Sequence, residues 1–238
     1  MAIYVKGNET KRRMILHTYE KLCDQTADQL TVRTLAKELS CSAAALYRYF
    51  DSLEYLIMVS SIRFLDTYMH EYTKLYEQEK EPEAFYIACW KLFDHYAFER
   101  PDIYYRLFWG CDNTVFGKAL QDYFELFPME GEDKGTGYQY VLLRTADMQS
   151  RDLMMLRRLE KRGLLNHDDA FFLSYANPLI ARGLVEAAAA MDEAGRKKQR
   201  KLCDYLIEHN TKIQIANHKI MGDSKENALV SHVLKDKE

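Results

Sequence analysis

The segment Thr31–Phe50, TVRTLAKELSCSAAALYRYF, decides the expected fold of this chain of 238 residues. Thr31 is a suitable N-cap, because its hydroxyl can accept a hydrogen bond from a backbone N–H two or three residues later. Small polar residues at 40–42 then separate two runs with helical spacing. The apolar residues expected to face inward are Leu35, Ala36, Leu39, Leu46 and Phe50. Two short helices joined by a tight turn predict a helix-turn-helix, whose second helix can enter the DNA major groove.

The side chains expected on the outer surface of the second helix indicate DNA recognition. Tyr47 and Tyr49 each combine an apolar ring with a phenol that can donate to a phosphate oxygen. Arg48 can donate to both O6 and N7 of guanine, and Ala43 and Ala44 are small enough to approach a thymine methyl group. The alternative is an ordinary helical hairpin that carries exposed aromatic residues.

Residues 9–57 resemble the DNA-binding domain of TetR-family transcriptional regulators. The resemblance rests on a helical stretch at 11–23, on LTVRTLA at 30–36 and above all on LYRYFDSLEYL at 46–56. The last run is far more specific than a generic helix-turn-helix. The resemblance implies an all-α protein with a three-helix DNA-binding domain at 1–56, a larger helical ligand-binding and dimerisation domain at 57–221 and a polar tail at 222–238.

On this resemblance, eight residues are expected to contact DNA: Thr31, Arg33, Ser42, Ala43, Ala44, Tyr47, Arg48 and Tyr49. Thr31 can serve both as a cap and as a phosphate ligand, since helix N-terminal amides bind anions. Arg33 matches a family position that reaches base edges, or it is a surface arginine. Two departures stand out. The family usually has Gly in the turn, where this chain has Ser40, and Lys at the start of the next helix, where it has Leu53. The second departure removes one expected phosphate contact.

The composition excludes several classes of protein. Hydrophobic residues make up 47% of the chain, and there is no apolar run of about 18 residues, so we expect no membrane span. Four prolines, ten glycines and almost no strand pattern favour an all-helical fold. The N-terminus lacks an apolar signal core, and the five cysteines are scattered without a CxxC pair. We therefore expect a cytoplasmic protein with reduced thiols and no metal site.

The net charge of −3 is unusual for a DNA-binding protein, but basic residues are enriched near the N-terminus. Residues 1–56 hold eight Lys and Arg and seven Asp and Glu, with a local cluster at 6–13. We expect a flexible arm at 1–8 and a first helix at 9–23, so the cluster would lie at a helix start. The helix dipole disfavours positive charge there, and a nearby phosphate backbone would compensate. A solvated basic face is the alternative.

The remaining pattern predicts long helices separated by few breaks. We expect one continuous helix over 53–78, a break at 79–82 and a polar loop at 128–137. Gly163 is a suitable C-cap for the helix before it. The later helices are expected at 138–162, 168–193 and about 194–220.

The region between residues 85 and 127 is unusually aromatic, with fourteen aromatic residues in 43. An apolar pocket between helices would use such residues, although core packing is the alternative for each one. The residues proposed for this ligand pocket are Tyr86, Trp90, Tyr105, Phe108, Trp109 and Met148.

The last two expected helices are amphipathic, and the first of them is rich in small residues that permit close packing. Such a pair can dock on a copy of itself as a four-helix bundle, or it can form an intramolecular hairpin only. The resemblance implies that these helices form the dimer interface. A dimer would present two recognition helices to a two-fold-related operator.

The sequence contains no GxSxG, Gly-rich phosphate loop, HExxH or Cys/His cluster, so we expect no enzymatic activity and no cofactor. The overall expectation is a homodimeric, sequence-specific DNA-binding regulator, a repressor that responds to a small-molecule effector and acts on a palindromic operator. The alternative is a helical module that binds a small molecule or a protein, with weak or secondary DNA binding.

Overall fold

The computed structural model describes residues 2–78, 81–128 and 147–221, and within these ranges all regular secondary structure is helical. The expected all-α class is therefore confirmed for this part of the chain. Packing divides the described residues into two compact units, each built from two stretches of sequence. Unit 1 holds residues 2–73 and 100–128, and unit 2 holds 74–78, 81–99 and 147–221. This is a division by packing, and the functional division at 56/57 remains a prediction.

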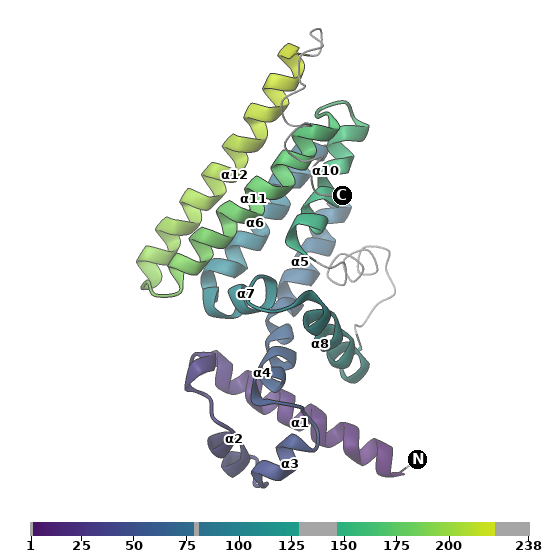
Figure 1. Cartoon of the computed structure of the whole chain (residues 1–238), viewed down its shortest axis with the longest axis vertical. Coiled ribbons are helices and arrows are strands. Elements are labelled where there is room, and N and C mark those ends of the chain that lie inside the picture. Colours follow the sequence, from purple (N-terminus) through teal and green to yellow (C-terminus); the bar gives the residue numbers. More distant parts are fainter. Residues whose placement is uncertain (1, 79–80, 129–146, 222–238) are drawn as a thin grey trace, which may run out of the picture. The chain divides into compact units, whose positions relative to one another are not determined.

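Unit 1 contains seven helices or parts of helices and two 3-10 turns (Figure 1). In chain order they are α1 (Ala2–Asp24), η1 (Ala27–Gln29), α2 (Val32–Glu38), α3 (Ala43–Tyr47), α4 (Leu53–Ser61), η2 (Ile62–Phe64), α5 (Leu65–Gln78, which continues into unit 2), α7 (Pro101–Phe108) and α8 (Asn113–Leu126).

Helix α4 is the centre of unit 1, and it packs against α1, α7 and α8. Its residues from Leu56 to Ser61 are all buried. Two polar contacts fix the surrounding helices. The phenol of Tyr55 donates to Asp122 of α8 at 2.6 Å, and Arg100 donates to the carbonyl of Leu22 near the end of α1 at 2.6 Å. The guanidinium of Arg100 also lies 4.7 Å from the ring centre of Phe64. The first contact holds α8 against α4, and the second holds the end of α1 beside the start of α7.

Unit 2 is formed mainly by α6 (Pro82–Glu99), α10 (Met148–Lys161), α11 (His167–Ala188) and α12 (Glu193–Met221). Helix α11 packs between α10 and α12, and α6 contacts all three (Figure 1). The inner positions are apolar, for example Leu173 and Val185 of α11 and Ile207 of α12. Pro178 lies inside α11, where it removes one helical hydrogen bond. Among the described residues, no helix is both long and apolar enough to cross a membrane.

Four expected boundaries were wrong. The expected 53–78 helix is interrupted by η2, directly after Ser60 and Ser61, whose hydroxyls donate to carbonyls four residues earlier. Such side-chain bonds compete with the backbone pattern and bend helices. The expected arm at 1–8 is helical from Ala2, because a helix extends by one hydrogen bond per residue once nucleated.

The third boundary concerns the helix expected at 138–162. Helix α10 begins only at Met148, because Asp147 adopts an extended conformation and its carboxylate accepts from the Ser150 N–H at 2.6 Å. The earlier part of that expected helix, most of the expected loop at 128–137 and the expected tail lie outside the described residues. Gly163 ends the helix as expected, with a φ of 68°. The fourth boundary is the end of the helix expected at 168–193, because α11 stops at Ala188.

Candidate nucleic-acid interface

The starts of α2 and α3 are fixed by side-chain caps. The Thr34 N–H donates to the hydroxyl of Thr31 at 3.1 Å, and the Thr34 hydroxyl donates back to the Thr31 carbonyl at 2.9 Å. The Ala45 N–H donates to the hydroxyl of Ser42 at 3.1 Å. The expected cap at Thr31 is therefore confirmed. The hydroxyls of Thr31 and Ser42 were also expected to contact DNA, and that role remains a prediction.

The turn between α2 and α3 is a Schellman motif. The Cys41 N–H donates to the carbonyl of Ala36 at 2.9 Å, and the Ser40 N–H donates to that of Lys37 at 3.2 Å. Ser40 has a φ of 53°, in the left-handed region that favours glycine. The geometry explains why glycine suits this position and shows that the serine adopts the same backbone conformation with some strain.

The inner side of the 31–50 segment is a closed apolar core. All five residues expected to face inward are buried: Leu35, Ala36, Leu39, Leu46 and Phe50. Met14, Ile15 and Leu22 of α1 are buried with exposures of 1% or less. Helix α1 itself packs mainly against α4. A core of this kind holds α3 in place without using any side chain of its outer face.

The outer side of the segment carries the residues proposed for DNA binding. Seven of the eight are exposed, namely Thr31, Arg33, Ser42, Ala43, Ala44, Tyr47 and Arg48. Tyr47 has 53% of its surface exposed, which is high for a large aromatic side chain. Tyr49 is half-buried, and the guanidinium of Arg48 lies 5.3 Å from its ring centre. This contact can orient Arg48 while its N–H groups remain available.

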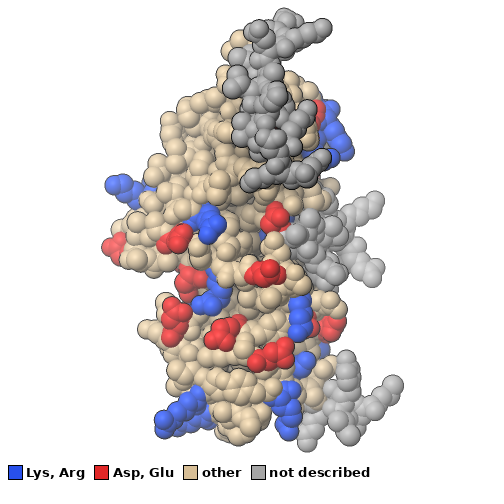
Figure 2. Space-filling view, in the orientation of Figure 1, with Lys and Arg blue, Asp and Glu red and all other residues tan. Residues whose placement is uncertain are grey.

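Charged side chains flank this face. Figure 2 shows blue Lys and Arg side chains projecting on both sides of the end that Figure 1 assigns to α2 and α3, with mainly uncharged surface between them. Phosphate backbones lie on both sides of a major groove, so flanking cations around an uncharged, aromatic centre suit duplex DNA. The half-buried Leu53 at the start of α4 offers no charge where the family resemblance implies a lysine.

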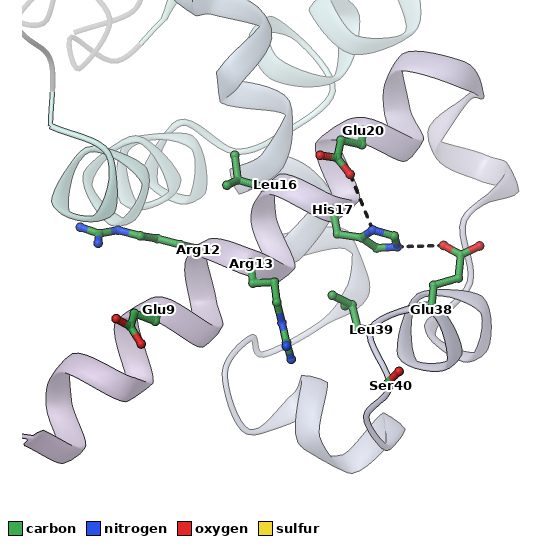
Figure 3. A pocket seen from close by; sticks show the side chains of 9 residues that line it. All are labelled: Glu9, Arg12, Arg13, Leu16, His17, Glu20, Glu38, Leu39 and Ser40. Carbon is green, nitrogen blue, oxygen red and sulfur yellow. Dashed lines mark hydrogen bonds and ion pairs between the residues drawn. The ribbon is translucent and has the colours of Figure 1, made fainter.

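A hollow of about 610 Å³ separates α1 from the end of α2 and the following turn (Figure 3). On its wall, the Nε2 atom of His17 lies 2.8 Å from a carboxylate oxygen of Glu38, and the Lys21 ammonium lies 2.9 Å from the other oxygen. Hydrogen bonds from Lys21 and His17 lower the pKa of Glu38. These contacts connect α2 to α1, and the sequence analysis did not identify them.

The basic cluster near the N-terminus does not lie at a helix start. Because α1 begins at Ala2, Lys11, Arg12 and Arg13 are in its middle, and the dipole argument for a compensating phosphate fails. Arg12 donates through Nε to the carbonyl of Leu126 at 2.7 Å, which gives it a structural role at the end of α8. Arg13 is exposed and lines the hollow (Figure 3).

The six residues proposed for a ligand pocket fall into two groups. Tyr105, Phe108 and Trp109 belong to unit 1, where Phe108 is buried and the other two are half-buried. The Phe108 ring packs 5.8 Å from that of Phe116 in the core. Tyr86, Trp90 and Met148 belong to unit 2. The two groups are not joined within one unit, and a common pocket remains a prediction.

Tyr86 and Trp90 converge on a buried carboxyl group. The Tyr86 phenol donates to one oxygen of Asp152 at 2.9 Å, and the Trp90 indole N–H donates to the other at 2.8 Å. The side-chain amide of Asn177 donates to the Tyr86 oxygen at 2.9 Å and is 3.3 Å from the hydroxyl of Thr211. Burial raises the pKa of Asp152 to about 8, although both donors oppose this shift. We call these five residues the Asp152 cluster.

The sequence analysis missed Asp152, although a signal was present. It lies four residues from both Met148 and Leu156, on the stripe that continues to Leu159, and Asp152, Leu156 and Leu159 are all buried. A charged residue on the inner stripe of a helix indicates either a buried polar network or a site. Within the described residues, no three or more His, Cys, Asp or Glu side chains are arranged to hold a metal ion. None of the five cysteines forms a disulfide.

Comparisons of the chain with protein-family models, with curated proteins and with solved structures find no match. The resemblance of residues 9–57 to TetR-family regulators therefore rests on the residues quoted above. The functional conclusion depends on the geometry of the 31–50 segment and of α11 and α12.

Proposed function

We propose that the chain is a sequence-specific DNA-binding transcriptional regulator of the TetR type that acts as a homodimer on a palindromic operator. Its recognition surface is the outer face of α3 with the start of α2, and Arg48 contacts a base edge while Tyr47 contacts the phosphate backbone. A small-molecule effector would act by favouring a spacing of the two recognition helices that does not fit the operator. Repression is the expected output.

One observation carries this proposal. The 31–50 segment buries every residue that its apolar spacing assigns to the core and leaves all eight residues assigned to DNA outside that core. An arginine and a tyrosine with 53% of its surface exposed have no role in the core of the unit. Exposed polar and aromatic side chains on a short helix with a closed inner face suit insertion into a major groove.

A stripe on α11 and α12 supports the homodimer. Among the described residues, nine large hydrophobic side chains are exposed, and seven of them lie on these two helices: Phe172, Tyr175, Leu179, Leu202, Tyr205, Ile213 and Ile220. The spacings of three, four, seven and eight residues place them on one side of each helix. An exposed apolar surface of this kind marks an interaction site, and a second copy of the same hairpin fits it as a four-helix bundle.

The decisive test is selection of random duplex DNA on the purified full-length protein at low and moderate salt. An enriched palindromic site is expected, with an affinity that falls steeply as salt rises. Enrichment of no sequence at either salt concentration would overturn sequence-specific recognition.

The roles of Arg48 and Tyr47 can be separated on the selected site. Arg48→Ala is expected to relax the preference at one base position, with a loss of about 1–3 kcal/mol of discrimination. Tyr47→Ala is expected to weaken binding to all sequences similarly. If Arg48→Ala changes neither affinity nor sequence preference, the assignment of Arg48 to base readout is wrong.

The homodimer is tested by introducing charge into the stripe. Leu179→Glu and Tyr205→Glu are expected to give monomers in sedimentation equilibrium, because each places a carboxylate in an apolar interface. Val115→Glu is the matched control, since Val115 is an exposed hydrophobic residue of α8 in unit 1. A wild-type protein that sediments as a monomer at all concentrations would contradict the homodimer.

Two observations favour the alternative function, a helical binding module with secondary DNA binding. The net charge is −3, and Leu53 stands where the resemblance implies a phosphate-binding lysine. The salt titration distinguishes the two functions, because such a module would retain its main ligand at salt concentrations that release DNA.

A further inference from the structure

Two carboxyl groups meet inside unit 2, where α12 packs on α6. Asp94 of α6 has no exposed surface, and Asp204 of α12 is partly covered. Neither carboxylate oxygen of Asp94, nor the Oδ1 atom of Asp204, accepts a hydrogen bond from an N–H or O–H group of the described residues. Buried carboxylates normally have several such donors, so the two groups require another explanation.

A hydrogen bond between the two carboxyl groups would supply the missing donor. Asp204 is a side-chain neighbour of Asp94 where α12 packs on α6, and the thiol of Cys203 also neighbours Asp94. Two carboxylate oxygens can form a hydrogen bond only if one of them carries a proton. Two negative charges this close in a buried site would also repel strongly. Burial and the neighbouring charge of Asp204 raise the pKa of Asp94 well above its usual range.

The surrounding charges favour the proton on Asp94. On α12, the Nε atom of Arg200 lies 3.7 Å from the Oδ2 atom of Asp204, so a cation stabilises the charged form of that residue. Burial raises the pKa of Asp204 as well, whereas Arg200 and Lys91 of α6 lower it and Glu208 of α12 raises it. On the α6 side, the His95 ring bonds to Arg200 at 2.8 Å and so helps to hold the guanidinium in place.

We propose that Asp94 and Asp204 share one proton at neutral pH, carried mainly by Asp94. The resulting hydrogen bond between the two carboxyl groups holds α12 against α6, and we call this contact the clasp. Loss of the proton in alkali leaves two buried charges face to face and opens the contact between the two helices. The inference concerns unit 2 alone and is independent of the proposed DNA-binding function.

The proton can be observed directly by infrared spectroscopy of the full-length protein. At neutral pH, the wild-type minus Asp94→Asn difference spectrum should show the carbonyl band of a protonated carboxyl group, because the variant removes the group that carries the proton. If both carboxyls were ionised, the spectrum would show a carboxylate band instead, and the proposal would be wrong. Asp152→Asn is the positive control, since burial raises the pKa of Asp152 to about 8 and its difference spectrum at neutral pH should also show a protonated carboxyl group. Glu193→Gln is the negative control, since Glu193 is exposed and paired with Lys197, and its difference spectrum should show a carboxylate band.

The clasp itself is tested through Cys203, which is fully buried on α12 beside the pair. Its rate of modification by a small thiol reagent is followed by mass spectrometry from neutral to alkaline pH. Dividing the wild-type rate by the Asp94→Asn rate at each pH removes the intrinsic effect of pH on thiol chemistry. The variant has no carboxyl proton to lose at this position, and its side-chain amide can donate to Asp204 at every pH.

The expected rate ratio is close to one at neutral pH and rises by up to about tenfold per pH unit once the pair loses its proton. The charge of Asp94 raises the pKa of Cys203, so its removal alone would make the variant react faster. That effect opposes the expected result and cannot imitate it. A ratio that stays constant over the whole pH range would overturn the clasp.

Asp204→Asn provides an independent check if Asp94→Asn does not fold. It leaves the proton on Asp94 but removes the neighbouring charge that raises the pKa of Asp94, so the protonated-carboxyl band should disappear at lower pH than in the wild type. Loss of the band at the same pH in both proteins would contradict a shared proton.

Discussion

The 31–50 segment and the Asp152 cluster use polar and aromatic side chains in opposite ways. In the segment, Arg48 and Tyr47 are exposed above a closed apolar core. In the cluster, the polar atoms of Tyr86 and Trp90 both donate to the carboxyl group of Asp152 in the interior of unit 2. The first arrangement leaves hydrogen-bonding groups available to a partner. The second uses them to compensate the cost of burying a carboxyl group.

The comparison distinguishes polar side chains that can bind a partner from polar side chains that stabilise the interior. The sequence analysis proposed both regions as sites on the basis of aromatic residues. The structure supplies a structural reason for Tyr86 and Trp90, whereas it supplies none for the exposure of Tyr47. Four measurements test this contrast.

The largest effect is expected at Asp152. The folded pKa is raised to about 8 from an ordinary value near 3.8, so the folded protein keeps a proton that the unfolded chain loses in this range. Stability from this group is therefore complete below about pH 4 and lost as the pH rises to about 8, a change on the order of 5 kcal/mol. Asp152→Asn should remove this slope. The measurement is urea unfolding of both proteins from pH 4 to 9.

Other buried acids also contribute to the pH dependence, so the informative quantity is the difference between the two proteins. If the free energies of unfolding of wild type and Asp152→Asn differ by a constant over the whole range, the buried carboxyl does not hold its proton as described.

The next effect is the contrast between adjacent residues of α3. Leu46 is 3% exposed, and Leu46→Ala should lower the free energy of unfolding by about 2–5 kcal/mol through lost burial and a cavity. Tyr47→Ala changes an exposed side chain and should alter stability by less than about 0.5 kcal/mol. Denaturant unfolding of both variants checks the assignment of inner and outer faces. Equal losses would show that Tyr47 is part of the core.

A smaller effect is expected at the cap of α3. Ser42→Ala removes the acceptor for the Ala45 N–H and should cost about 1 kcal/mol of stability. Ser42→Asp keeps an acceptor and should recover most of that loss. Thermal unfolding of the two variants gives the comparison, and equal melting temperatures for both variants would exclude capping as the role of Ser42 in stability.

The smallest effect is expected at the two left-handed positions. Ser40→Gly should raise stability by about 0.5 kcal/mol, because glycine adopts a φ of 53° without steric cost. Gly163 has a φ of 68° and open space around its Cα, so Gly163→Ala should destabilise by about 1 kcal/mol through backbone strain alone. Chemical denaturation of both variants gives the two values. A loss of stability in Ser40→Gly would mean that the serine side chain contributes more than the strain it causes.

The helical class and the inner face of the 31–50 segment were predictable from the sequence because burial follows the helical period. Leu35, Leu46 and Phe50 repeat at spacings that leave little choice of face. The caps at Thr31 and Ser42 also follow local rules. The break at Ile62 was not predicted, because it depends on whether serine hydroxyls bond to the backbone or to other partners.

The buried polar contacts could not be predicted from the sequence either. Asp152 and Tyr86 are 66 residues apart and Asp94 and Asp204 more than 100, so only the packing of α6 with α10 and α12 brings each pair together. Aromatic richness indicated that the region around Tyr86 and Trp90 was unusual. It could not show that their polar atoms serve an internal carboxyl group.

The interleaving of the two compact units has a consequence for synthesis of the chain. Unit 1 takes residues from both sides of Lys74–Glu99, and unit 2 takes residues from both sides of Arg100–Ala146. Helices α1 and α4 leave the ribosome well before α8, on which they pack, and α6 leaves long before α12. Neither unit can complete its packing during early elongation, so the nascent chain exposes apolar helix faces for longer than a chain of two consecutive domains. Folding of this protein should therefore depend on elongation rate and on chaperones more than its all-helical composition suggests.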